Sequence, residues 1–128
     1  MKMAKLLLLG LCVLFAAAPA YSHHSFPATY NVEQETEVTG QVVAFLYRNP
    51  HATIQVMVTE ESGEKVRYLI EWAGATALAG SGVKRGTLVP GDTVVIKGNP
   101  GRNAADHRAR LVSITRPSDG WVWGQVYN

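Results

Sequence analysis

Histidine is the residue type in this chain best suited to metal chemistry, and three of the four histidines lie in two short motifs. His23 and His24 open a His-His-Ser-Phe run, and His51 closes an Asn-Pro-His run at residues 49–51. Imidazole nitrogens suit Cu(II), which prefers nitrogen donors in a tetragonal arrangement. We therefore expect His23, His24 and His51 to be metal ligands, with copper as the cofactor. His107 lies on another expected strand and is a weaker candidate.

The first 22 residues have the pattern of a secretory signal peptide. Lys2 and Lys5 form a short positive start, and an uncharged apolar run follows at residues 6–18. That run is shorter than the roughly 20 apolar residues that a membrane-spanning helix needs. We therefore expect a periplasmic or secreted protein whose mature form has no membrane span.

Two cleavage points are possible, and each gives a different copper chelate. Cleavage after Ser22 frees the amine of His23, so this amine, its own Nδ1 and the imidazole of His51 would form a histidine brace. Cleavage after Ala20 makes His23 the third residue, where the free amine, two backbone amides and the imidazole form a square-planar chelate. Both arrangements predict Cu(II) binding that weakens at acid pH, because the nitrogen ligands must lose their protons.

Composition limits the other functional classes. Removal of residues 1–22 leaves ten Lys and Arg residues against ten Asp and Glu, with no basic run longer than Lys84-Arg85. Because a nucleic-acid surface needs clustered basic residues, we expect no nucleic-acid partner. The single cysteine, Cys12, lies in the expected signal peptide, so residues 23–128 must fold without a disulfide. An enzyme is the less favoured class, since the sequence places no nucleophile, base and orienting residue together.

Alternating apolar and polar residues predict a mostly β domain at residues 23–128. An extended lead-in contains Pro27, and an Ala- and Gly-rich stretch at 73–83 predicts one short helix. Pro90 and Gly91 predict a type II turn. Strands are expected at residues 36–47, 51–59, 65–72, 93–97 and 107–115, with a short edge strand at 121–123.

This order of three strands, a short helix and two strands is typical of an OB barrel, which is five-stranded and partly open. Gly40 lies inside the first expected strand, where a glycine often marks the bulge or bend of a barrel corner. We therefore predict an all-β fold with one short helix, arranged as a small five-stranded OB-like Greek-key barrel. A sandwich-like sheet with one loose helix is the alternative.

The two histidine motifs, with residues 40–42, 82–88, 90–92 and 98–100, resemble a family of small exported bacterial proteins catalogued only as a domain of unknown function. The resemblance spans nearly all of residues 23–128. It implies export and a small β fold, and it implies no activity.

Other interpretations of the same residues remain open. His23 and His24 can be an incidental surface pair, and His51 can cap its turn or bond a backbone carbonyl. Glu71 can orient a histidine or be solvated. Without a metal, the barrel would be a module that binds a small ligand or an envelope protein through one face, formed by Tyr47, Arg48, Arg67 and Trp72. Tryptophans are more often packing residues than ligand platforms.

Overall fold

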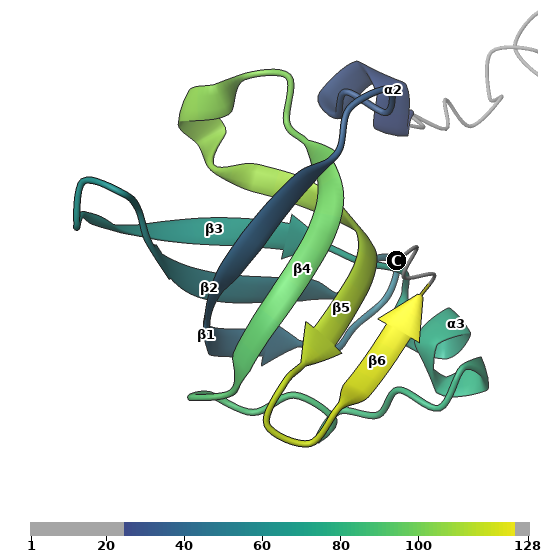
Figure 1. The fold of residues 1–128 in the computed structure, drawn as a ribbon. Helices are drawn as coiled ribbons and strands as arrows, with labels where there is room; N and C mark the ends of the chain where they lie inside the picture. Colours follow the sequence, from purple (N-terminus) through teal and green to yellow (C-terminus); the bar gives the residue numbers. More distant parts are fainter. Residues whose placement is uncertain (1–24, 125–128) are drawn as a thin grey trace, which may run out of the picture.

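The structure is a computed structural model that describes residues 25–124. The expected signal peptide, His23 and His24 therefore lie outside the described residues. None of the described helices is long and apolar enough to cross a membrane. In chain order the elements are α2 (Phe26–Thr29), β1 (Thr36–Leu46), β2 (Thr53–Thr59), β3 (Lys65–Glu71), α3 (Ala75–Gly80), β4 (Thr93–Pro100), the 3₁₀-helix η1 (Ala104–Asp106), β5 (Arg108–Arg116) and β6 (Trp121–Gly124) (Figure 1).

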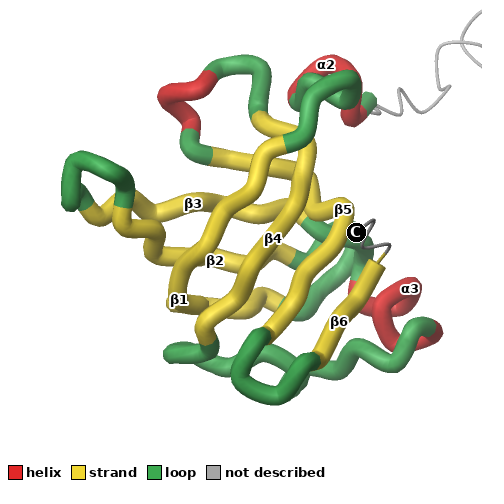
Figure 2. Tube along the Cα trace, in the orientation of Figure 1, coloured by secondary structure: helices red, strands yellow, loops and turns green. Residues whose placement is uncertain are grey.

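Five strands close into a barrel, which confirms the predicted fold class. β1 pairs with β2 and β4, β2 pairs with β3, and β4 pairs with β5, all antiparallel. Parallel pairing of residues 69–71 of β3 with residues 108–110 of β5 closes the barrel. β6 pairs with residues 113–116 of β5, beyond this closing seam. Figure 2 shows the strands wrapping around one another, with α3 at one end. The order matches an OB-type Greek key.

Gly40 lies where β1 pairs with both of its neighbouring strands. It pairs with Val58 of β2 on one side and Val94 of β4 on the other. A Cβ atom at this position would lie 2.3 Å from the carbonyl oxygen of Met57, closer than any side chain permits. The register shift itself falls two residues later, between Val42 and Ala44. The glycine therefore permits close approach of two strands, and the bulge lies beside it.

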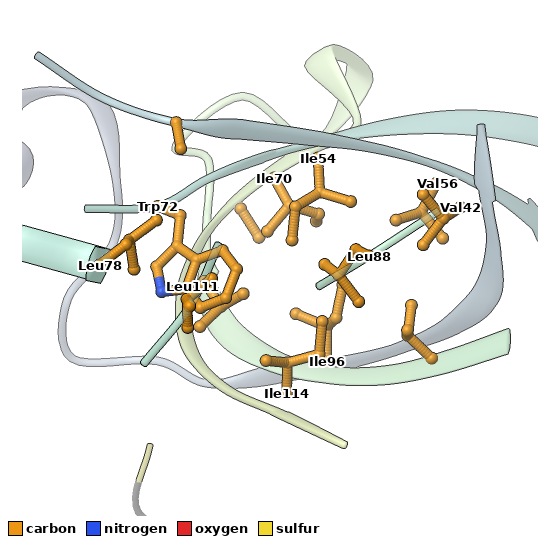
Figure 3. Close-up of a cluster of buried hydrophobic side chains, with 14 residues drawn as sticks. Val42, Ile54, Val56, Ile70, Trp72, Leu78, Leu88, Ile96, Leu111 and Ile114 are labelled. Carbon is orange, nitrogen blue, oxygen red and sulfur yellow. The ribbon is translucent and has the colours of Figure 1, made fainter. Parts of the chain in front are cut away.

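The hydrophobic core fills the barrel interior with residues from all five of its strands, α3 and the loop after it (Figure 3). Alternate residues of the strands point inward, as the period-2 patterns predict. Fully burying each such aliphatic side chain contributes about 1.5–3 kcal/mol to folding. The most deeply buried include Ile54, Val56, Ile70, Leu78, Ile96 and Ile114.

The remaining strand ends lie within one or two residues of the prediction, so that His51 and His107 fall just outside β2 and β5, and two segments differ more. Residues 26–29 form the helical turn α2, whereas an extended lead-in was predicted. Pro27 lies in the first turn of this helix, where its missing N–H leaves no hydrogen bond unmade. β4 continues past Gly98 to Pro100, whereas the strand was predicted to end before Gly98. A Cβ at Gly98 would lie 2.5 Å from the carbonyl oxygen of Arg110, so this glycine also serves close strand contact.

Candidate functional site

The Asn-Pro-His turn is fastened to the start of α3. The side chain of Asn49 accepts a hydrogen bond from the backbone N–H of Thr76 (3.2 Å) and donates one to its hydroxyl (3.0 Å). The N–H of Ala75 donates to the carbonyl of Arg48 at 3.0 Å. Asn49 thus satisfies one of the N–H groups that a helix start leaves without an intrahelical partner. The peptide between Asn49 and Pro50 is cis.

Gly74 lets the turn and the helix start lie in contact. A Cβ at Gly74 would lie 2.4 Å from the carbonyl oxygen of Pro50. On the other side of the turn, the N–H of Trp72 donates to the carbonyl of Ala52 at 2.8 Å. The backbone that carries His51 is therefore held between the end of β3 and the start of α3.

His51 is oriented by a carboxylate. Its Nδ1 lies 2.5 Å from Oε1 of Glu71, and the other carboxylate oxygen accepts a hydrogen bond from the hydroxyl of Tyr30. Nη2 of Arg108 donates to the same hydroxyl at 3.1 Å and lies 3.6 Å from Oε2 of Glu71. The side chain of His51 is 43% exposed, whereas that of Glu71 is 16% exposed. A neutral imidazole that donates from Nδ1 keeps its lone pair at Nε2. The structure thus favours the orienting role for Glu71.

Tyr30 anchors this network from the lead-in. It is 1% exposed. Burial, and then the hydrogen bond to the Glu71 carboxylate, raise the pKa of Tyr30 to about 12. The phenol therefore keeps its proton at neutral pH and acts as a donor to Glu71, which fixes the carboxylate that faces His51.

Helix α2 brings the N-terminal segment against His51. The ring of Phe26 stacks on the imidazole of His51, with centroids 5.4 Å apart and planes inclined by 28°. The guanidinium carbon of Arg110 lies 4.0 Å from the centroid of the Phe26 ring, a cation–π contact. Nε of Arg102 donates to the carbonyl of Pro27 at 2.6 Å. Arg110 of β5 and Arg102 of the β4–β5 loop therefore hold α2 over the turn.

A cleft of about 330 Å³ opens beside His51 and Glu71. Phe26, Trp72 and Trp123 contribute its aromatic walls. Trp72 is buried, and among the described residues its indole N–H has no hydrogen-bond partner. The ring of Trp123 meets Trp72 edge-on at 4.9 Å. The cleft therefore combines one oriented imidazole with aromatic surface.

The predicted metal ligands are placed only in part. His51 is described, whereas His23 and His24 lie outside the described residues. Within residues 25–124, no group of three or more His, Cys, Asp or Glu side chains could hold a metal ion. His107 lines a different cleft and contacts the ring of Tyr68 edge-on at 5.3 Å. The described part of the chain thus offers a single oriented imidazole.

The four residues of the alternative ligand-binding face differ in burial. Trp72 is buried in the core. The hydroxyl of Tyr47 shares its one proton between the carbonyl of Ala75, the first residue of α3, at 2.9 Å and that of Val83, after the helix, at 3.0 Å. Arg48 and Arg67 are exposed, and Arg67 donates to the side chain of Gln55 at 3.2 Å. The two aromatic residues therefore pack the barrel end around α3, while the two arginines face solvent.

Sequence reasoning missed Phe26, Tyr30, Arg108 and Arg110. Tyr30 follows the lead-in helix α2, and the two arginines lie on the fifth expected strand, where nothing in the sequence relates them to His51. Their contacts join segments that are 41 and 78 residues apart, as in Tyr30 with Glu71 and Arg108 with Tyr30. The one local signal is the presence of Phe26 and Tyr30 just after the His-His-Ser run. An extended, solvent-exposed segment has no need of large aromatic side chains, so these two residues indicate that the lead-in packs against the barrel.

Comparison with known proteins identifies one family model. It is described as a "Family of unknown function (DUF6152)" and matches residues 11–110. The matched range includes both histidine motifs and the residues of the His51 network: Tyr30, His51, Glu71 and Arg108. No curated protein matches the chain.

Proposed function

The chain belongs to DUF6152, a family of unknown function, and for this member we propose an exported protein that binds a divalent copper ion. His51 and the N-terminal residues His23 and His24 supply the nitrogen ligands. The single observation that carries the proposal is the contact of 2.5 Å between Nδ1 of His51 and Oε1 of Glu71. The export signal at residues 1–22 and a periplasmic or secreted location are part of the same proposal.

Glu71 prepares His51 to act as a ligand. Metal-binding histidines usually donate their second ring N–H to a carboxylate or carbonyl, which fixes the ring and makes the ligating nitrogen more basic. Here the carboxylate is itself held by Tyr30 and Arg108. Nε2 of His51, on a partly exposed ring, is then the nitrogen that receives the ion.

The position of α2 supports the participation of the N-terminal histidines. The Phe26 ring already contacts the imidazole of His51. His24 lies two residues before Phe26, a span of at most about 7 Å, and His23 lies three residues before it, a span of at most about 10 Å. These lengths allow His24 and His23 to meet the ion at His51 without any movement of the barrel.

The test is a Cu(II) titration of protein exported and processed by its own signal, together with its intact mass. With a mature chain that starts at His23, we expect one tightly bound Cu(II) and a loss of affinity well beyond about ten-fold in His51→Ala. His107→Asn is the matched control, since Asn tolerates the left-handed backbone of that position. Unchanged affinity in His51→Ala would remove His51 from the site.

The mass decides between the two expected chelates. A mature chain that starts at Tyr21 predicts that His23→Ala abolishes binding while His51→Ala leaves it unchanged. A chain that starts at His23 predicts that both variants lose affinity. Weak uptake that neither variant alters would contradict the copper proposal and favour the metal-free module, which binds a small ligand or an envelope protein.

A further inference from the structure

A second cleft, also of about 330 Å³, lies between the lead-in after α2 and the loop that joins β4 to β5. Tyr30 forms an isolated antiparallel bridge with Gly101, and the N–H of Arg102 donates to the carbonyl of Thr29 at 3.0 Å. These bonds fix the two walls relative to each other. The side chains that line the cleft include those of Asn31, Gln34, Tyr68, Arg102, His107 and Arg108.

The lining is cationic. Two guanidinium groups and one imidazole face this cleft, and no Asp or Glu is among its lining residues. Arg102 is exposed, and its Nε is engaged by the carbonyl of Pro27. Its two Nη groups have no partner within residues 25–124. A guanidinium presents these donors in a planar fork that matches the two oxygens of a carboxylate or phosphate.

Two nitrogen atoms of the lining residues are also unpartnered. Nδ1 of His107 and Nε of Arg108 are buried and have no hydrogen-bond partner in the described part of the chain. Buried polar atoms are almost always hydrogen-bonded, so each exception calls for an explanation such as a bound molecule. His107 also holds a left-handed backbone (φ 44°), a conformation that non-glycine residues seldom adopt outside constrained sites.

We propose that this second cleft binds a small soluble anion that carries a carboxylate or phosphate group. Arg102 supplies the main charge, because the charge of Arg108 is partly balanced by Glu71 at 3.6 Å. The amide side chains of Asn31 and Gln34 offer further donors, and the ring of Tyr68 offers an apolar wall. The volume lies at the lower end of that found for small-molecule sites, which limits the ligand to a small organic acid or phosphate.

The experiment is a titration of ¹⁵N-labelled protein with succinate and, separately, with inorganic phosphate at low ionic strength. We expect saturable amide shifts concentrated at residues 101–108, with a dissociation constant of about 1 mM or lower. Saturation by either anion supports the site and identifies its preferred group. Shifts that neither saturate nor concentrate on this loop, with either anion, would overturn the proposal.

Charge-matched variants separate a built site from general attraction. Arg102→Gln removes the exposed fork and should weaken binding about ten-fold, while Arg102→Lys should restore part of it. Lys84→Gln removes the same charge shortly after the end of α3 and should change the affinity less than about two-fold. Figure 1 shows α3 and the β4–β5 loop at opposite ends of the barrel. Equal losses in Arg102→Gln and Lys84→Gln would contradict a specific cleft. None of these variants alters a proposed copper ligand, and the anion titrations use metal-free protein, so the two proposals can fail separately.

Discussion

Glu71 is the residue at which three segments of the chain meet. Its two carboxylate oxygens contact His51 before β2, Tyr30 in the lead-in and Arg108 at the start of β5. This carboxylate cannot rotate without breaking its contact with His51 and its hydrogen bond from Tyr30. The orientation of the His51 ring is therefore set by the surrounding structure and not by the turn alone.

Replacing Glu71 tests that orientation. Glu71→Gln keeps the shape but removes the charge, and loss of such an outer-shell partner typically costs about 10–100-fold in metal affinity. We expect a loss of Cu(II) affinity in that range, measured by competition with a chelator of known affinity. Glu61→Gln, in the exposed β2–β3 turn, should bind as the wild type does. Wild-type affinity in Glu71→Gln would mean that Glu71 does not support the metal ligand.

Tyr30 gives the fold a pH dependence at the alkaline end. Its folded pKa of about 12 is higher than the roughly 10 of an unfolded tyrosine, so folding favours the protonated phenol. This contribution is fully present below about pH 10 and is lost as the pH rises to about 12. We expect the free energy of unfolding to fall by about 1–2 kcal/mol across that window in the wild type.

Denaturant unfolding at several pH values from 9 to 12 measures this alkaline loss of stability in two variants, each of which replaces one tyrosine by phenylalanine. Tyr30→Phe should be less stable at neutral pH, because Glu71 loses a donor, and should lack this alkaline loss. Tyr68→Phe should keep it. An alkaline loss of the same size in Tyr30→Phe would show that another group is responsible.

At the scale of elements, α3 matters because its first turn holds the Asn-Pro-His turn. Asn49 caps the helix, and Gly74 allows the carbonyl of Pro50 to approach. A loss of either contact would move His51 relative to Glu71. The helix therefore positions the candidate site without supplying a functional side chain to it.

Gly74→Ala should push the Asn-Pro-His turn away from the start of α3. Its Cβ would collide with backbone atoms, and overpacking of this kind typically costs about 1–3 kcal/mol of stability. Gly80→Ala is the control within the same helix. A Cβ there meets nothing within 4 Å, so this substitution should be neutral or stabilise by about 0.5–1 kcal/mol. Urea unfolding of both variants checks the difference, and equal stabilities would show that the turn tolerates displacement.

The connection from α3 to β4 is held by the Pro-Gly-Asp turn. Oδ2 of Asp92 accepts hydrogen bonds from the N–H of Val89 at 3.1 Å and from Nη1 of Arg116 at 2.9 Å. The same Nη1 donates to the carbonyl of Thr87 at 2.7 Å. Gly91 adopts φ 95°, as the predicted type II turn requires. The motif therefore has a structural role here, joining the turn to β5.

Asp92→Asn should weaken this junction. The charge-assisted bond from a mostly buried Arg116 is lost, and we expect a destabilisation of about 1–2 kcal/mol. Asp106→Asn, on the surface, should change stability by less than about 0.5 kcal/mol. Thermal unfolding at neutral pH measures the stability of both variants. If Asp92→Asn is as stable as the wild type, backbone hydrogen bonds alone hold this junction.

For the whole molecule, the closing seam of the barrel and the candidate site are the same place. Parallel pairing sets Glu71 opposite Arg110 and Leu69 opposite Arg108. Closing the barrel therefore brings the two β5 arginines to the carboxylate and to Phe26. The described residues contain no cysteine, so core packing rather than a disulfide must hold this seam closed.

Ile70→Ala tests how far the core maintains the seam. Ile70 is fully buried and pairs with Ala109 across the seam, and a truncation of this kind costs about 2–5 kcal/mol. Val122→Ala, at an exposed position on β6, should cost less than about 0.5 kcal/mol. Urea unfolding curves of the two variants and the wild type, fitted together, give the free energy of unfolding of each. Similar stabilities for the two variants would mean that the seam is held mainly by its backbone hydrogen bonds.

The sequence by itself determined the strands, their faces, the turns and the strand order of the barrel. These features depend on local rules: an apolar residue at every second position, a glycine where φ is positive, and a proline at the second position of a turn. The histidine motifs and a possible orienting role for Glu71 were also visible at this level. Local rules failed at α2 and at the end of β4, where contacts with distant segments set the backbone.

Only the tertiary structure decided which side chains share a site. Nothing local to Tyr30 indicates that it donates to Glu71, 41 residues away, or that Arg108 reaches it from 78 residues away. Such contacts exist because the barrel closes and places the ends of β3 and β5 beside the lead-in. Barrel closure is a property of the whole sheet, so no window of sequence contains it.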